Sequence, residues 1–138
     1  MRYSVKKTFV IAYAHRLLNY NGRCENLHGH NAKIEIIVEA DKLDNQDMVI
    51  DFIKLNQVVK KWLDENLDHK VILSESDPLV RVLKDHNQEV FTVKENPTAE
   101  ILAKLILKEI KKHGINAKIV RFWETETSMA EIKEEGYG

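Results

Sequence analysis

Hydrophobic and polar side chains alternate along two early stretches of the chain, as they do in β-strands with one buried face. Residues 3–13 are rich in β-branched and aromatic types, and residues 31–40 carry an apolar side chain at every second position. Ala32, Ile34, Ile36 and Val38 lie on one face of this second stretch, and Lys33 and Glu35 lie on the other. A period of two predicts strands, and we expect these two to pair as a long antiparallel ribbon.

Apolar residues recur at helical spacing in two later stretches. The first helix is predicted to begin after Asp51, which suits an N-cap, and to extend to about Leu67. Its apolar stripe is Phe52, Leu55, Val59 and Trp62. The second helix opens after either Asn96 or Thr98 as the cap and ends at His113-Gly114. Its buried stripe is predicted to be Ile101, Leu102, Leu105 and Ile106.

These elements predict an α+β domain. Further strands are expected at about 116–124 and 127–133, and the segment between the two helices is interpreted as a loop. We therefore expect a four-stranded antiparallel sheet with two helices packed on one face, in a single domain over residues 1–138. The last residues, EIKEEGYG, are expected to be a frayed end. A sheet this small leaves two edges to cover, which favours association between copies.

Composition and charge argue against several classes of partner. Lysine and arginine (21) nearly balance aspartate and glutamate (22), for a net charge of −1, and the basic pairs are scattered. Nucleic-acid binding is not expected, because it rests on clustered cationic contacts. The apolar run at 9–14 is far shorter than the roughly 20 residues needed to cross a bilayer. The opening MRYSVKK leads into no secretory h-region, so we expect a cytoplasmic protein without a membrane partner.

Three of the six histidines, with the sole cysteine, fall between residues 15 and 30. His28 and His30 share the parity of the core-facing strand positions, so both imidazoles face the sheltered side if the strand extends back through Gly29. His15 ends the preceding strand, and the ribbon is expected to bring it opposite them. Three imidazole nitrogens can hold zinc and leave a fourth position open, which is typical of a catalytic site. The clustering favours this interpretation over surface histidines.

Cys24 has two possible roles beside such a site. As a fourth ligand it would close a structural zinc site, and the spacing alone does not exclude this. Held just outside the ligands, it would feel the cation, ionise more readily and serve as a base or nucleophile.

Other charged residues are weaker signals on their own. Asp68-His69, just past the first helix, could polarise a thiolate, although such a dipeptide is also typical of a polar turn. Glu124 near a strand end and Glu100 in the first turn of a helix are equally typical of an edge carboxylate and a favourable N-terminal charge.

Six motifs, in family order and spanning nearly the whole chain, resemble the 6-pyruvoyltetrahydropterin synthase and 6-carboxytetrahydropterin synthase family. They are AHRL (14–17), C-x-x-x-H-G-H (24–30), MVIDF (48–52), LDH (67–69), PTAE (97–100) and WET (123–125). The resemblance implies the tunnelling fold, or T-fold, in which two-helix, four-stranded units assemble into barrel-forming trimers and usually hexamers. Active sites in this family lie at subunit interfaces.

The resemblance also implies a role for nine residues. The zinc ligands would be His15, His28 and His30; the catalytic triad would be Cys24, Asp68 and His69; and the pterin would be bound by Glu124, Glu100 and Thr98. Tyr13 departs from the family, which commonly has a small residue at that position.

The implied activity is that of a zinc-dependent lyase acting on 7,8-dihydroneopterin triphosphate. The three residues between Cys24 and His28 resemble the branch that makes 6-carboxy-5,6,7,8-tetrahydropterin, acetaldehyde and triphosphate for 7-deazaguanine synthesis, which leads to queuosine and archaeosine. Three alternatives stay open. A pyruvoyl synthase would use the same substrate, and Glu25 leaves room for a folate-pathway relative that makes a hydroxymethyl pterin. A non-catalytic zinc-bound oligomer would bind a pterin or purine, with Cys24 closing the zinc shell.

Overall fold

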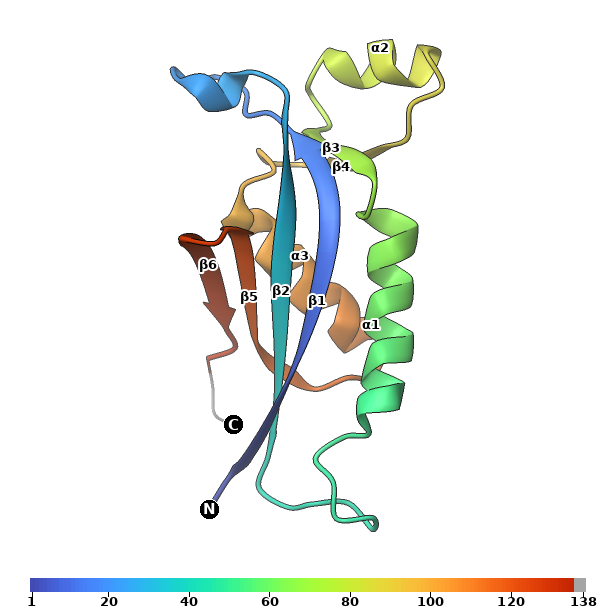
Figure 1. The fold of residues 1–138 in the computed structure, drawn as a ribbon, viewed down its shortest axis with the longest axis vertical. Coiled ribbons are helices and arrows are strands. Elements are labelled where there is room, and N and C mark those ends of the chain that lie inside the picture. The colour runs from blue at the N-terminus through green and yellow to red at the C-terminus, as the bar shows by residue number, and fades with distance from the viewer. Residues whose placement is uncertain (136–138) are drawn as a thin grey trace.

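A long antiparallel ribbon forms the centre of the protein, as the alternating pattern predicts. A computed structural model describes residues 1–135 of the chain. In it, β1 (Tyr3–His15) pairs with β2 (His28–Ala40) along their whole length, from Tyr3 opposite Ala40 to His15 opposite His28. The histidine ends of both strands point toward the upper end of Figure 1. There they meet the connecting loop, which contains the short 3-10 helix η1 (Arg23–Glu25).

The sheet has six strands in the order β4-β3-β1-β2-β5-β6, so the prediction of four strands is wrong. The expected strands β5 (Ala117–Thr125) and β6 (Ser128–Lys133) are present and antiparallel to their neighbours. Two additional strands are present, β3 (Lys70–Ser74) and β4 (Val90–Val93). β3 pairs with β1 in parallel, and β4 pairs with β3 in parallel. The α+β fold with two long helices is otherwise as expected.

The predicted loop between the helices holds β3, α2 (Leu79–Asp85) and β4. Their lengths explain why the sequence pattern misses them. β3 and β4 have five and four residues, too few for alternation to show, and α2 has seven residues, none of them buried. These elements are stabilised by pairing with other strands and by packing against neighbouring segments. Such tertiary contacts cannot be read from the local sequence.

The tail expected to fray, EIKEEGYG, is partly ordered in the structure. Residues 131–133 belong to β6, and the backbone N–H of Glu134 still donates to the carbonyl of Lys118 at 2.8 Å. Pairing with β5 therefore orders this part of the tail, while residues 136–138 lie outside the described part of the chain.

The two long helices have the predicted caps. In α1 (Phe52–Asn66) the Asp51 carboxylate accepts the N–H of Ile53 at 2.8 Å. In α3 (Ala99–Lys112) the Thr98 hydroxyl accepts the N–H of Ile101 at 3.2 Å, so Thr98 is the cap and Asn96 is free for another task. Gly114 follows α3 with a φ of 85°, a left-handed conformation that glycine adopts at little cost.

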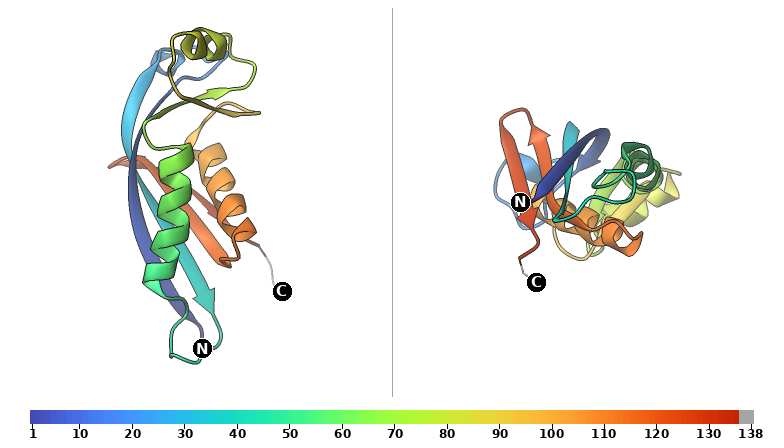
Figure 2. Two further views of the ribbon diagram at one scale, coloured as in Figure 1. Left: turned by 90° about the vertical axis from the view of Figure 1, so that its right-hand side faces the viewer. Right: turned by 90° about the horizontal axis from the view of Figure 1, so that it is seen from below.

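Both helices cover the same face of the curved sheet, where the core lies (Figure 2). The predicted stripes are only partly correct. Phe52, in the first turn of α1, is 48% exposed, and Leu63 takes its place in the core. On α3, Ile101 and Leu105 are half-buried. The buried positions of α3 are Leu102, Ala103, Ile106, Leu107 and Ile110. The stripe is displaced because α3 packs against both β5 and β6.

Among the residues that the structure describes, no helix has the length and apolarity that a bilayer-spanning segment requires.

Candidate metal and active site

Three histidines from the ends of β1 and β2 converge at one point. The ribbon pairs His15 directly with His28, and His30 projects from the same face two residues along β2. One ring nitrogen of each lies within 4.8 Å of the others, and the Nε2 atoms of His15 and His28 are 3.1 Å apart. His15 is buried, and His28 and His30 are half-buried. The predicted convergence is thus present in the fold.

The hydrogen bonds of these rings determine which nitrogens carry lone pairs. His15 Nδ1–H donates to the carbonyl of Pro97, and His28 Nδ1–H donates to that of Asn26, each at 2.7 Å. Both Nε2 atoms therefore point lone pairs at each other unless a cation lies between them. Nitrogens bound at 2.0–2.1 Å in a tetrahedral site are about 3.3 Å apart, close to the distance found here.

His30 completes the donor set. Its Nε2 atom is buried and has no hydrogen-bond partner among the described residues. Burial lowers the pKa of both His15 and His30, which favours the neutral rings that bind metals. An orphaned nitrogen beside two facing lone pairs fits a divalent metal ion bound by the three imidazoles.

Glu124 lies beside the imidazoles, at the end of β5. Its carboxylate oxygens are 3.6 Å from Nε2 of His30 and 3.8 Å from Nε2 of His15. The side chain is 25% exposed. Its oxygens do not belong to the three-histidine group itself among the described residues, so Glu124 borders the candidate metal position and remains available to a ligand.

Cys24 lies in η1, on the loop that joins the two histidine-bearing strands. It is half-buried, and its carbonyl accepts the N–H of Leu17 at 2.9 Å. Within residues 1–135, its sulfur is not part of the metal-ligand group. This geometry favours a thiol held outside the ligands over a fourth ligand.

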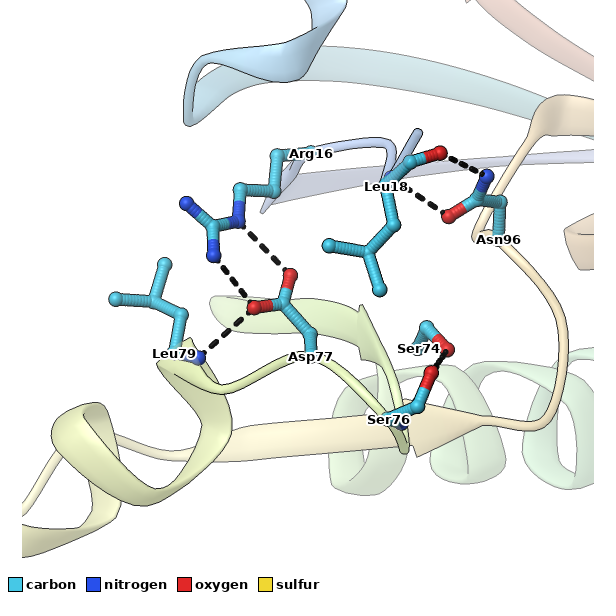
Figure 3. A network of polar contacts seen from close by, with 7 residues as sticks. All are labelled: Arg16, Leu18, Ser74, Ser76, Asp77, Leu79 and Asn96. Atoms are coloured by element: carbon cyan, nitrogen blue, oxygen red, sulfur yellow. Dashed lines mark hydrogen bonds and ion pairs between the residues drawn. The ribbon is translucent and has the colours of Figure 1, made fainter. Parts of the chain in front are cut away.

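Two polar contacts hold the first part of this loop (Figure 3). The Asn96 amide pairs with the backbone of Leu18, accepting its N–H at 2.8 Å and donating to its carbonyl at 2.9 Å. Arg16 donates twice to the buried Asp77 carboxylate, at 2.8 and 2.6 Å, and Asp77 also accepts the N–H of Leu79. Because Asn96 directly precedes Pro97, one short segment positions both the His15 ring and the loop with Cys24.

Sequence reasoning considered Asn96 only as a helix cap and did not consider Asp77. The Arg16 partner lies 61 residues away and the Leu18 partner 78 residues away. Contacts between residues so far apart in sequence leave no periodic pattern. Once Thr98 is taken as the cap, however, the polar Asn96 beside it could have suggested another role.

The Arg16–Asp77 pair predicts a pH-dependent stability. The Arg16 hydrogen bond, opposed by burial, lowers the pKa of Asp77 below 3.8. A lowered carboxyl pKa stabilises the fold above that pH, and this contribution is lost as the pH falls through the folded-state value. We expect Asp77→Asn to lower the free energy of unfolding by about 2 kcal/mol at pH 7. Urea titrations should show the difference shrinking below pH 3.8.

Asp64→Asn is the matched control, since Asp64 pairs with Lys60 on an exposed helix surface. Its effect should stay below about 0.5 kcal/mol. A pH-independent loss in Asp77→Asn would contradict the ionic role of Asp77.

The Asp68–His69 pair forms beside β1, directly before the start of β3. His69 Nδ1 lies 2.9 Å from an Asp68 oxygen, and the other Asp68 oxygen accepts the N–H of Ala12 at 2.8 Å. Burial alone would raise the pKa of Asp68, but the hydrogen bonds from Ala12 and His69 outweigh it and lower the pKa. The His69 backbone is left-handed, with a φ of 60°.

His69 borders a depression of about 430 Å³ whose lining also includes Tyr13 and His30. The other strand residues that line it are Ala12, Ala14, Gly29 and Asn31, whose side chains alternate with those of Tyr13 and His30 and so project from the opposite side of the ribbon. The His69 ring is 79% exposed and makes no hydrogen bond to Cys24 or to the three histidines within residues 1–135.

The remaining predicted residues lie at the start of α3. The Thr98 hydroxyl caps the helix, and Glu100 is exposed in its first turn. Pro97 joins this segment to the imidazole cluster through the bond to His15. Thr98 and Glu100 make no hydrogen bond to the three histidines in the described part of the chain, so the structure places them near the site without bringing them into it.

Comparison with known proteins identifies the family. A family model described as 6-pyruvoyl tetrahydropterin synthase matches residues 4–135. The chain belongs to the 6-pyruvoyl tetrahydropterin synthase family. Membership in this family of tetrahydropterin synthases confirms the expectation of an enzyme of the lyase class.

Named relatives and solved structures agree with this assignment. The chain is 35% identical to the 6-carboxy-5,6,7,8-tetrahydropterin synthase of Aquifex aeolicus, over 98% of this chain and 100% of the relative. An uncharacterised protein of Wolinella succinogenes has a TM-score of 0.81 at 26% identity, covering 98% and 99% of the two chains. The 6-pyruvoyl tetrahydropterin synthase of Caenorhabditis elegans, 20% identical over 98% and 97% of the chains, has a TM-score of 0.73 and confirms the T-fold.

Proposed function

We propose that this protein is a zinc-dependent 6-carboxytetrahydropterin synthase. It converts 7,8-dihydroneopterin triphosphate to 6-carboxy-5,6,7,8-tetrahydropterin, with acetaldehyde and triphosphate as the other products. The observation that carries the proposal is the three-imidazole cluster with Glu124 beside it and Cys24 on the adjoining loop. The names of its relatives support the carboxy branch. A place in 7-deazaguanine synthesis follows from that branch, and the cytoplasmic location stays a prediction.

His15, His28 and His30 hold the zinc ion in this proposal, and the carbonyls of Pro97 and Asn26 orient the rings of His15 and His28. A bound zinc ion supplies a Lewis acid that lowers the pKa of the substrate side-chain hydroxyls. Neutral rings suit this task, and the burial of His15 and His30 keeps them neutral at physiological pH.

Glu124 binds the pterin ring. Its carboxylate accepts the two parallel donors of the ring, the 2-amino group and N3–H, in one plane. Glu124 lies 3.6 Å from the nearest imidazole nitrogen, so a ligand that it binds is adjacent to the proposed metal site. In this proposal the ring of the ligand is held by Glu124 and its side chain lies toward the ion. Thr98 and Glu100, at the start of α3, are proposed to make further contacts with the ligand.

Cys24 moves the side-chain proton. A thiol near a divalent cation ionises more readily, and the thiolate serves as a general base. Asp68 holds the His69 imidazole at 2.9 Å and can stabilise its protonated form, which in turn favours the thiolate. Because the His69 ring is 79% exposed and makes no hydrogen bond to Cys24 within residues 1–135, we propose that a neighbouring copy supplies the Asp68–His69 pair to Cys24.

A homo-oligomer follows from this arrangement. We propose a trimer-based assembly, formed through the sheet edges β4 and β6, in which the depression beside His69 receives the neighbouring copy. Each chain contributes one domain over residues 1–138.

The products distinguish the branches. Purified zinc-loaded protein incubated with 7,8-dihydroneopterin triphosphate should release acetaldehyde and a carboxylated tetrahydropterin, identified by mass spectrometry. Heat-inactivated protein is the control. A pyruvoyl product would move the protein to the other branch, a hydroxymethyl pterin would favour the folate-pathway relative, and binding without any product would favour the non-catalytic oligomer.

One observation favours the cysteine-based branches over the hydroxymethyl alternative. Cys24 is half-buried, whereas Glu25, the residue that could replace it, is exposed. The Glu25 carboxylate is thus more exposed to solvent than the Cys24 thiol. This favours Cys24 over Glu25 as the residue that acts on a bound ligand.

A further inference from the structure

Tyr13 lies under the imidazole cluster, although no proposed role includes it. It belongs to β1, and its side chain shares the core-facing side of the ribbon with His15. Its ring packs edge-on against His15, with centroids 5.0 Å apart, and lies 5.7 Å from the rings of His30 and Phe122. The residue is 4% exposed. Tyr13 therefore forms one wall of the space that the imidazoles enclose.

The hydroxyl of Tyr13 has no partner. It is buried, and it makes no hydrogen bond within residues 1–135. A buried hydroxyl without a partner is unfavourable, and phenylalanine would give the same ring packing without that cost. An unpartnered polar atom in a native core calls for a group that the protein itself does not supply.

The position of the second unpartnered atom strengthens this point. In the described part of the chain, two buried side-chain polar atoms lack a partner, Tyr13 Oη and His30 Nε2, and their rings are neighbours. The metal accounts for the nitrogen. Packing does not account for the hydroxyl, and the ring that carries it contacts His15 and His30, two of the three imidazoles.

The chemistry of the phenol sets the direction of the missing hydrogen bond. A tyrosine side chain is a neutral phenol at neutral pH and has a proton to donate. The Tyr13 ring and the Glu124 carboxylate both lie next to His30, so together they offer a donor and an acceptor to one ligand. The Tyr13 hydroxyl and the Glu124 carboxylate therefore match a ligand ring that carries a hydrogen-bond acceptor next to its N–H groups.

We propose that Tyr13 is a substrate-binding residue whose hydroxyl donates a hydrogen bond to an acceptor of the ligand held between Glu124 and the three imidazoles. The inference rests on the proposed function, in which that ligand is a pterin. The amide-like edge of a pterin has a carbonyl oxygen next to N3–H. Tyr13 and Glu124 thus read adjacent acceptor and donor groups of one ring, which would discriminate against rings that lack either.

Tyr13→Phe tests the inference, with neopterin as the probe. Zinc content, thermal stability and the neopterin dissociation constant should be measured for the zinc-loaded protein, the last by fluorescence. We expect unchanged zinc content, a melting temperature equal to or above that of the wild type, and a dissociation constant raised about tenfold. Tyr3→Phe is the matched control, because Tyr3 lies at the far end of β1 and is 43% exposed.

The outcomes separate the inference from the function on which it rests. Equal neopterin affinity in wild type and Tyr13→Phe overturns the inference alone. Loss of zinc in the variant also overturns it, because Tyr13 would then support the metal ligands. If the wild type fails to bind neopterin while it retains zinc, the proposed function falls together with the inference.

Discussion

Replacing Cys24 with alanine is expected to lower turnover of 7,8-dihydroneopterin triphosphate by about 10³-fold while zinc stays bound. The thiol lies outside the three-histidine group, so its removal takes away a proton-transferring group and leaves the metal ligands intact. Turnover should be followed by product formation, and zinc by elemental analysis of the dialysed protein. Loss of zinc together with turnover would instead make Cys24 a ligand and favour the non-catalytic oligomer.

A mixing experiment extends this prediction to the neighbouring chain. His69→Asn should also be nearly inactive, and asparagine tolerates the left-handed backbone at this position, so the fold is preserved. If Cys24 and His69 of one site come from different chains, hetero-oligomers of Cys24→Ala and His69→Asn should recover about a quarter of the wild-type turnover. Recovery would require both residues to meet across an interface. Mixtures that remain inactive would contradict the shared site.

Removing a metal ligand is expected to have the second large effect. His28→Ala leaves two imidazoles and should weaken zinc binding by more than about 100-fold, with turnover lost in proportion to the metal. The change also removes one of two lone pairs that face each other at 3.1 Å, so the metal-free variant should be no less stable than the metal-free wild type. Zinc titration with a chromophoric chelator and thermal unfolding in EDTA measure the two effects.

His113→Ala is the matched control for ligand removal. His113 is an exposed histidine at the C-terminal cap of α3, remote in role from the cluster. It should keep both zinc and turnover. A His28→Ala variant that bound zinc as tightly as wild type would refute the three-imidazole site.

The metal cluster could be predicted from the sequence because it depends on local geometry. Strand parity places His28 and His30 on one face, and one hairpin-like ribbon brings His15 opposite them. The alternating apolar positions of β1 and β2 leave little freedom in register, since a shift by one residue would expose the apolar face. The two capped helices are local in the same sense.

The position of the Asp68–His69 pair could not be predicted in this way. Asp68 and His69 are adjacent in sequence to a correctly predicted helix, yet their orientation depends on β3 pairing with β1. β3 is too short to show a period, and its parallel partner is more than fifty residues distant in sequence. The same holds for Asn96 and Asp77, whose partners on the loop are set by the packing of distant segments.

By itself, the sequence determined the ribbon, the two long helices and the gathering of three imidazoles, because each of these follows from side-chain periodicity within a continuous stretch. Only the tertiary structure decided that, within residues 1–135, Cys24 stays outside the three-histidine group, the His69 ring is largely exposed, and the Tyr13 hydroxyl is buried without a hydrogen-bond partner. These features depend on which segments distant in sequence come into contact. The pattern of polar and apolar residues within one helix or strand does not determine those contacts.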